Sequence, residues 1–179
     1  MYHSGMQRRK RHHLSDEVFT GQNHIVSLTI CTADRGRWLA RHDLAAIVQA
    51  DILGLHEDHP VVGYCIMPDH LHLLMGNSGS TLGSIVRGIK GRTSRRIHRI
   101  EPGLSLWQAD YWDHIVRRAE GLYSVLQYIL MNPVRAGIVN NWWDYEWSGS
   151  PLAGRLGPEF FSSAAPEDIL WRDLLNDGP

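Results

Sequence analysis

Two histidines spaced two positions apart, His70 and His72, are the residues whose type and spacing most directly suggest chemistry. They lie in MPDHLHLLM, residues 67 to 75, a segment that is otherwise largely apolar. In a β-strand, side chains at positions i and i+2 share a face, with Cα atoms about 6.6 Å apart, so both imidazoles can bind one metal ion. The pattern alone favours a plainer interpretation, two half-exposed histidines on an open sheet face. Two imidazoles are also too few for a structural zinc site, so a metal would need a further ligand.

A second pair of candidates, Tyr128 and Asn132, lies on a predicted helix over residues 122 to 132. The apolar stripe expected to face the core of that helix consists of Leu122, Val125, Leu126, Ile129 and Leu130. Tyr128 and Asn132 fall outside this stripe and are one helical turn apart, so a hydroxyl and an amide oxygen can face the same point. The alternative is a tyrosine that packs at the sheet edge and an asparagine that ends the helix before Pro133.

The elements that would position these residues can be predicted from periodicity. Strands are expected over 24 to 31, 61 to 67, 70 to 75 and 106 to 116, with Pro68 and Asp69 forming a turn between the second and the third. Amphipathic helices are expected over roughly 45 to 55, 82 to 99 and 122 to 132. The order β-α-β-β-α-β-α predicts an α+β fold, in which helices pack on a ferredoxin-like (RRM-like) antiparallel sheet.

Composition is that of a globular protein with one main domain. The chain has 179 residues, of which 43% are hydrophobic and 21% charged. No apolar run approaches the roughly 20 residues that a membrane helix needs, and no secretory signal is apparent. A cytoplasmic protein without membrane association is therefore expected. Cys31 and Cys65 lie in apolar segments without CxxC spacing, which favours buried free thiols over a disulfide or a zinc site.

The net charge of −1 conceals an uneven distribution along the chain. Residues 84 to 99 carry six basic side chains and no acid, and a basic arm covers residues 8 to 11, whereas the segment after residue 140 carries a net charge of −5. A local cluster of cations attracts phosphate whatever the total charge is, so these stretches are candidates for contacts with a nucleic-acid backbone. A solvated basic face is the commoner meaning of such a run. The candidate DNA-binding residues are Arg8, Arg9, Lys10, Arg11, Arg87, Lys90, Arg92, Arg95, Arg96 and Arg99.

Four ordered blocks together resemble a known family. The blocks are MPDHLHLLM, SLWQADYWDHIVRRAE, YILMNPVRAGIV and DYEWSGS. They resemble the single-tyrosine HUH transposases and, within that family, the REP-associated tyrosine transposases. The resemblance covers roughly residues 20 to 150, so we expect an HUH endonuclease domain over 1–150, with its basic N-terminal arm, and an acidic C-terminal tail over 151–179 that contains a possible short helix.

The resemblance implies roles for individual residues. It makes His70 and His72 metal ligands and Tyr128 the nucleophile. Asn132 stands where a further ligand, a glutamine in some relatives, is expected, and its side chain is shorter. Asp69 stands where an asparagine is frequent, which changes the charge beside the metal. Oxygen and imidazole ligands with open positions fit Mg²⁺ or Mn²⁺.

The activity that the resemblance implies is cleavage and strand transfer of single-stranded DNA near the hairpins of repeated palindromic elements, through a 5′-phosphotyrosine intermediate. The partner would be single-stranded or hairpin DNA, and the protein would be nucleoid-associated, either as a monomer or as a homodimer that exchanges the tyrosine helix. One alternative is a non-catalytic module that binds DNA or RNA hairpins and retains a vestigial HUH site. Another is a metal-dependent hydrolase of small phosphate esters.

Overall fold

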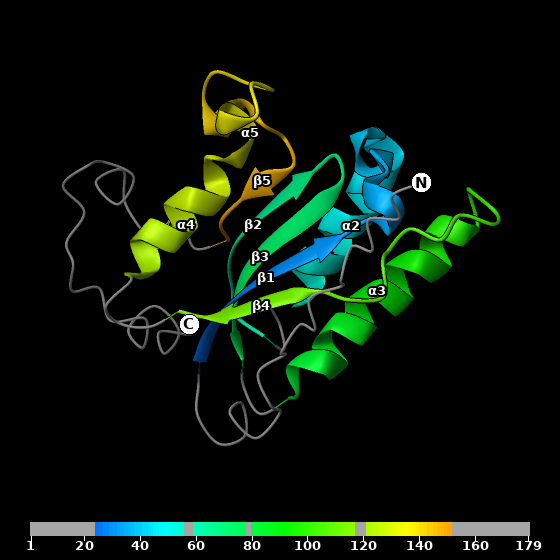
Figure 1. The fold of residues 1–179 in the computed structure, drawn as a ribbon, viewed down its shortest axis with the longest axis horizontal. Coiled ribbons are helices and arrows are strands. Elements are labelled where there is room, and N and C mark those ends of the chain that lie inside the picture. The colour runs from blue at the N-terminus through cyan, green and yellow to red at the C-terminus, as the bar shows by residue number, and fades with distance from the viewer. Residues whose placement is uncertain (1–23, 56–58, 78–79, 117–120, 152–179) are drawn as a thin grey trace, which may run out of the picture.

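An antiparallel sheet of five strands forms the centre of the structure (Figure 1). The computed structural model describes residues 24–55, 59–77, 80–116 and 121–151. The strands are β1 (His24–Cys31), β2 (Val61–Met67), β3 (His70–Asn77), β4 (Trp112–Ile115) and β5 (Ser148–Gly149). Their spatial order is β4-β1-β3-β2-β5, and every pairing is antiparallel. The first four strands have the ferredoxin-like order, which confirms the predicted fold class, and β5 extends the sheet beyond β2.

Helices cover both faces of this sheet (Figure 1). The helices α2 (His42–Gly54) and α3 (Leu82–His98) pack on one face, and α4 (Leu122–Leu130) packs on the other, followed by the single turn α5 (Asn132–Arg135). Because side chains alternate along a strand, Leu71 and Leu73 of β3 enter the core beneath α2 and α3, while Leu74 enters the core beneath α4. His70 and His72 have the parity of Leu74 and therefore lie on the α4 face.

Three short 3₁₀ helices were not predicted: η1 (Ala33–Arg35), η2 (Trp38–Ala40) and η5 (Trp142–Asp144). The first two belong to the connection between β1 and α2, which packs against the β2–β3 turn. The backbone N–H of Thr32 donates to the carbonyl of Asp69 at 3.0 Å, and that of Leu39 donates to the carbonyl of Pro68 at 2.9 Å. These bonds bring the connection beside the first residues of β3.

The strand predicted over 106 to 116 is wrong in extent, since only Trp112–Ile115 forms β4. Trp107 makes an isolated bridge with Thr32. The following carbonyls, of residues 108 to 110, all accept hydrogen bonds from the Lys90 ammonium at 2.9 to 3.0 Å. A side chain of α3 therefore takes up backbone acceptors that a strand would have used for pairing, which alternation in the sequence does not reveal.

The helix predicted over 122 to 132 ends at Leu130, and a new turn begins at Asn132. Pro133 has no N–H to continue the helical ladder. The Asn132 side chain compensates, because its Nδ2 donates to the carbonyls of Tyr128 at 3.0 Å and Ile129 at 3.1 Å. Tyr128 and Asn132 thus lie on consecutive helices joined at a fixed bend. Within the described residues, no helix is long and apolar enough to cross a membrane.

Candidate active site

His70 and His72 converge at the start of β3. Their Nε2 atoms lie 3.0 Å apart, and the rings meet edge to face with centroids 4.6 Å apart. The other nitrogen of each ring is held from behind. Nδ1 of His70 lies 2.7 Å from Asp69 Oδ1, and Nδ1 of His72 lies 3.0 Å from Thr29 Oγ1 on β1. Fixing one ring nitrogen so that the other points at a shared position is how proteins orient metal-binding histidines.

The hydrogen positions follow from this chain of contacts when both rings are neutral. A carboxylate only accepts, so His70 donates from Nδ1 to Asp69 and presents a bare lone pair at Nε2. His72 then donates from Nε2 to His70, and its Nδ1 accepts from the Thr29 hydroxyl. A shift of the His72 proton to Nδ1 would expose both Nε2 lone pairs together without charging either ring.

The surroundings of His72 keep its ring neutral. Burial is the main cause that lowers the pKa of His72 to about 3; the charges of His70, Arg135 and Arg35 act in the same direction, and Asp69 opposes the shift. Only the neutral ring can donate a lone pair to a metal. Protons therefore compete poorly for this nitrogen near neutral pH.

Tyr128 lies beside the histidine pair and comes from the same chain. Its ring meets that of His72 edge to face with centroids 6.2 Å apart, and 56% of its surface is exposed. The core residues of the predicted stripe on α4 hold it there: Leu126, Ile129 and Leu130 are buried, and Leu122 and Val125 pack against the same core. The prediction that Tyr128 projects away from that stripe is confirmed, because its hydroxyl-bearing ring faces solvent and the histidines.

The converging histidines could hold part of the coordination shell of a divalent cation. In the described segments, no three His, Cys, Asp or Glu side chains gather as a metal cluster. The structure brings the two imidazoles together, whereas the contacts of the third predicted ligand, Asn132, run from its Nδ2 to the carbonyls at the end of α4. Two imidazole nitrogens would leave several coordination positions of a bound cation open to water and phosphate oxygens.

Two arginines that were not predicted as site residues border the pair. The Arg135 guanidinium lies over the Tyr128 ring at 4.1 Å, and its Nη2 donates to the Tyr128 carbonyl at 2.6 Å. Arg35 donates to Asp69 Oδ2 at 3.3 Å. The NPVRAG block contains Arg135, but nothing in the spacing of residues 32 to 36 indicates that Arg35 turns back toward Asp69.

The predicted DNA-binding side chains of α3 fall into two groups. Lys90 is tied to backbone carbonyls, and Arg92 makes a two-point contact with the buried carboxylate of Asp51 at 2.7 and 3.0 Å. The remaining four arginines are exposed, namely Arg87, Arg95, Arg96 and Arg99. The basic arm Arg8, Arg9, Lys10 and Arg11 and the acidic tail after residue 151 lie outside the described residues.

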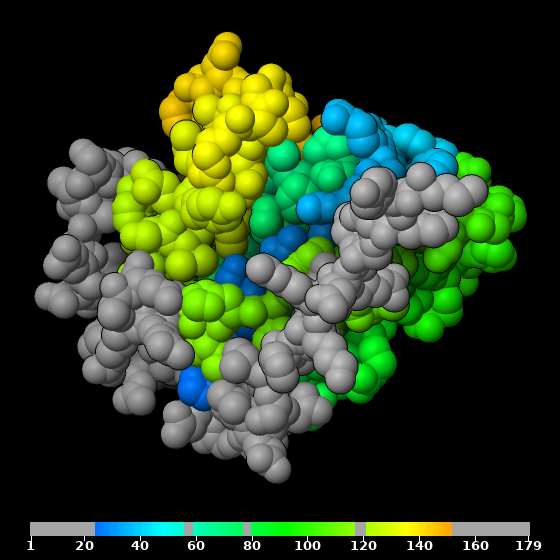
Figure 2. Space-filling model, viewed as in Figure 1, coloured from blue at the N-terminus to red at the C-terminus, as the bar shows by residue number. Residues whose placement is uncertain are grey.

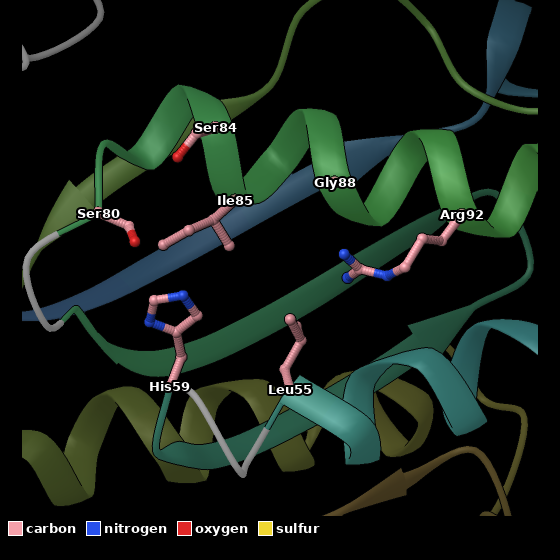
Figure 3. A pocket seen from close by; sticks show the side chains of 7 residues that line it. All are labelled: Leu55, His59, Ser80, Ser84, Ile85, Gly88 and Arg92. Atoms are coloured by element: carbon pink, nitrogen blue, oxygen red, sulfur yellow. The ribbon is translucent and has the colours of Figure 1, made fainter.

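The surface near α4 and the pocket near α3 are on opposite sides of the sheet. Figure 2 shows strand residues reaching the surface between the bulk of α4 and α5 (yellow) and that of α2 and α3 (cyan and green). A pocket of about 160 Å³ lies between the end of α2 and one side of α3 (Figure 3). Its lining residues are Leu55, His59, Ser80, Ser84, Ile85, Gly88 and Arg92. It adjoins the core beneath α2 and α3, so it is separate from the histidine pair.

The chain belongs to the family described as "Transposase IS200 like", whose model matches residues 18–132. A Haemophilus influenzae protein provisionally named a REP-associated tyrosine transposase is 29% identical over 107 residues, and an uncharacterized protein of the same organism is 30% identical over 77 residues. These matches span 52% and 41% of this chain, but only 60% and 43% of the two relatives.

Among solved structures, the fold is similar to that of a REP-associated tyrosine transposase bound to a REP hairpin. The TM-score is 0.61, and the match covers 92% of each chain at 20% sequence identity. At this identity the comparison establishes the shared fold. It agrees with the antiparallel sheet and packed helices described above.

Proposed function

We propose that this transposase cleaves and rejoins single-stranded DNA at a specific site near a hairpin of a repeated palindromic element. Tyr128 is the nucleophile, and His70, His72 and Asn132 hold a Mg²⁺ or Mn²⁺ ion. The family and the fold support the general class. The observation that carries the proposal is the position of Tyr128, whose ring lies beside His72 of the same chain while both histidine Nε2 atoms converge at 3.0 Å.

Different residues would perform different parts of phosphoryl transfer. Attack by the Tyr128 oxygen on the scissile phosphorus would form a 5′-phosphotyrosine bond and break the bond between that phosphorus and the 3′-oxygen. The tyrosine hydroxyl loses one proton and the leaving 3′-oxygen gains one, so the step is balanced. When bound, the metal would polarise the phosphate and offset its developing charge. The sheet fixes the histidines and the core fixes α4, so nucleophile and phosphate can be held in line, which is the main requirement of this chemistry.

The covalent bond retains the energy of the phosphodiester. Attack on phosphotyrosine by the 3′-hydroxyl of another DNA end would restore the tyrosine and join two strands without a nucleotide cofactor. Because each chain brings Tyr128 to its own His72, we propose that one subunit contains a complete site. The proposed DNA partner is a hairpin with a single-stranded flank, in line with the hairpin bound by the transposase of similar fold.

The test is covalent capture of DNA. Labelled single-stranded oligonucleotides from palindromic repeats near the gene are incubated with the protein, with and without Mg²⁺ or Mn²⁺, and separated on a denaturing gel. We expect a metal-dependent protein–DNA band that is lost in Tyr128→Phe. It should remain in Tyr123→Phe, which removes another hydroxyl from the same helix.

Two results would contradict the proposal. Tight DNA binding without any covalent band would favour a hairpin-binding module with a vestigial site. Phosphate-ester hydrolysis that survives Tyr128→Phe would favour attack by water instead of tyrosine.

A further inference from the structure

A strained turn brings Arg35 to the histidine pair. Asp34 and Arg35 have φ values of 51° and 56°, a left-handed conformation that is unfavourable for residues other than glycine. Backbone strain of this kind persists where surrounding contacts enforce it, and it concentrates at functional sites. Here Thr32 enforces it, because its Oγ1 lies 2.7 Å from the carbonyl oxygen of Gly36 and 2.9 Å from that of Asp69.

This turn places the Arg35 side chain next to Asp69. Arg35 reaches Asp69 Oδ2 at 3.3 Å, while Oδ1 of the same carboxylate lies 2.7 Å from His70. The Arg35 side chain remains 54% exposed. A guanidinium has five N–H donors, so one contact with Asp69 leaves others for an incoming anion.

Arg135 reaches the site from α5, whereas Arg35 belongs to the β1–α2 connection. It is the last residue of the single turn α5 (Asn132–Arg135), and Gly137 follows two residues later with a φ of +66°. Its guanidinium lies 4.1 Å from the centre of the Tyr128 ring and contacts the Tyr128 carbonyl. A cation over the face of the nucleophile's ring is well placed to receive the negative group that the nucleophile attacks.

Both arginines contact residues that border the histidine pair. Arg35 binds Asp69, which holds His70, and Arg135 lies over the ring of Tyr128, which meets that of His72. Arg35 comes from the β1–α2 connection and Arg135 from α5, so two different elements each place a guanidinium group next to a residue that contacts the histidine pair. Within the described part of the chain, Asp69 is the carboxylate that contacts this group of residues, and it is already shared by Arg35 and His70.

We propose that Arg35 and Arg135 bind the non-bridging oxygens of the DNA phosphate that Tyr128 attacks. This inference rests on the proposed function. Planar guanidinium groups match phosphate oxygens in two-point contacts, which fixes the orientation of the phosphate as well as its charge. Arg135 would leave the face of the Tyr128 ring as the phosphate arrives, and Arg35 would hold the same phosphate against the histidine side.

The experiment measures binding in the absence of cleavage. In the Tyr128→Phe background with Mn²⁺, the affinity is measured by fluorescence anisotropy for single-stranded oligonucleotides from the flanking repeats. Each oligonucleotide carries one neutral methylphosphonate, placed in turn at every linkage. Arg35→Gln and Arg135→Gln are compared with Arg95→Gln, an exposed arginine on α3.

We expect neutralisation of one particular linkage to weaken binding about ten-fold in the Tyr128→Phe protein and in its Arg95→Gln derivative. In Arg35→Gln or Arg135→Gln, the same neutralisation should weaken binding less than two-fold, because the arginine that would bind this phosphate is already absent. That linkage should coincide with the cleavage position mapped with the unmodified protein. Arg→Lys at either position should restore part of the ten-fold response, which a purely structural role would not do.

An equal loss at every linkage in all variants would overturn this inference. The inference would also fail if a covalent Tyr128 adduct forms but the affinity loss at every linkage is the same with and without Arg35 or Arg135. In that case the proposed function would be retained without this inference. If the coupling is present but no adduct ever forms, the two arginines bind the phosphate and the proposed cleavage fails. Thermal unfolding of each variant checks that the fold is retained.

Discussion

At the scale of single residues, the candidate site is a series of side-chain contacts from Thr29 through His72 and His70 to Asp69. Thr29 and Asp69 fix the two imidazoles from behind, so that Nε2 of His70 and of His72 meet at 3.0 Å. Burial and neighbouring positive charge both disfavour the charged form of His72. The arrangement keeps the His72 ring neutral, and it makes the stability of the protein depend on pH.

The first prediction is this pH dependence in the metal-free protein. The pKa of His72 falls from an ordinary value of 6.5 to about 3 on folding, so the unfolded chain binds more protons between these values. Stability is therefore present above pH 6.5 and is lost as pH falls toward 3. The free energy of unfolding, measured by urea titration, should fall by roughly 2 kcal/mol more from pH 7 to pH 5 in the wild type than in His72→Gln. Equal slopes in the two proteins would contradict it.

The residues that could be predicted from sequence are those with a periodic or spaced signal. His70 and His72 follow from strand alternation, and Tyr128 follows from its place outside an apolar stripe. Arg35 could not be predicted in this way. Its position depends on a left-handed backbone conformation at Asp34 and at Arg35 itself, and neither residue is a glycine that would indicate such a turn. Its contact with Asp69 exists only after the β1–α2 connection packs on the β2–β3 turn.

At the scale of elements, the position of α4 on the sheet depends on one glycine. A Cβ atom at Gly63 of β2 would lie 2.2 Å from Cδ1 of Leu126, which is fully buried on α4. The helix therefore approaches the strand as closely as the missing side chain allows. Tyr128 lies two residues beyond this contact, so the closeness of the packing sets where the tyrosine stands above the histidines.

The second prediction concerns this contact. Gly63→Ala should destabilise the protein by about 1–3 kcal/mol, because the buried Leu126 side chain would have to shift to admit the new methyl group. It should also slow formation of the proposed Tyr128 adduct by displacing α4. Gly54→Ala is the matched control, since a Cβ there meets nothing within 4 Å, and it should be neutral or stabilising by up to about 1 kcal/mol. Urea unfolding and the gel assay measure the two effects, and equal behaviour of the two variants would refute this account of α4.

At the scale of the whole molecule, the sheet separates two charged regions. The histidine pair and Tyr128 lie on the α4 face, whereas the basic helix α3 covers the other face. The sequence shows six cations between residues 84 and 99 but not which of them remain available, because Asp51 and the carbonyls that Lys90 binds come from other elements. The long-range pairings of the sheet decide this, which is why composition alone cannot.

The third prediction separates two neighbouring arginines of α3. Arg95→Glu should weaken DNA binding and lower the slope of log Kd against log salt by about 1, while leaving stability within about 0.5 kcal/mol. Arg92→Glu should destabilise the fold by about 3 kcal/mol, because it leaves the buried Asp51 carboxylate beside a second negative charge. Anisotropy titrations at several salt concentrations and urea unfolding provide the two readouts. An unchanged binding isotherm for Arg95→Glu would remove α3 from the DNA surface.

The order of elements along the chain also determines when the site exists during synthesis. The hairpin with both histidines is complete at Asn77, but Tyr128 comes much later, and its helix shares a core with Tyr145, whose hydroxyl donates to the Ile66 carbonyl on β2 at 2.8 Å. Ribosomes add about 5–20 residues per second, so a nascent chain spends seconds with the histidines but without the tyrosine. A chain released early by a stalled ribosome would present the proposed metal pair without the proposed nucleophile. Such a fragment would lack the residue that we propose attacks DNA.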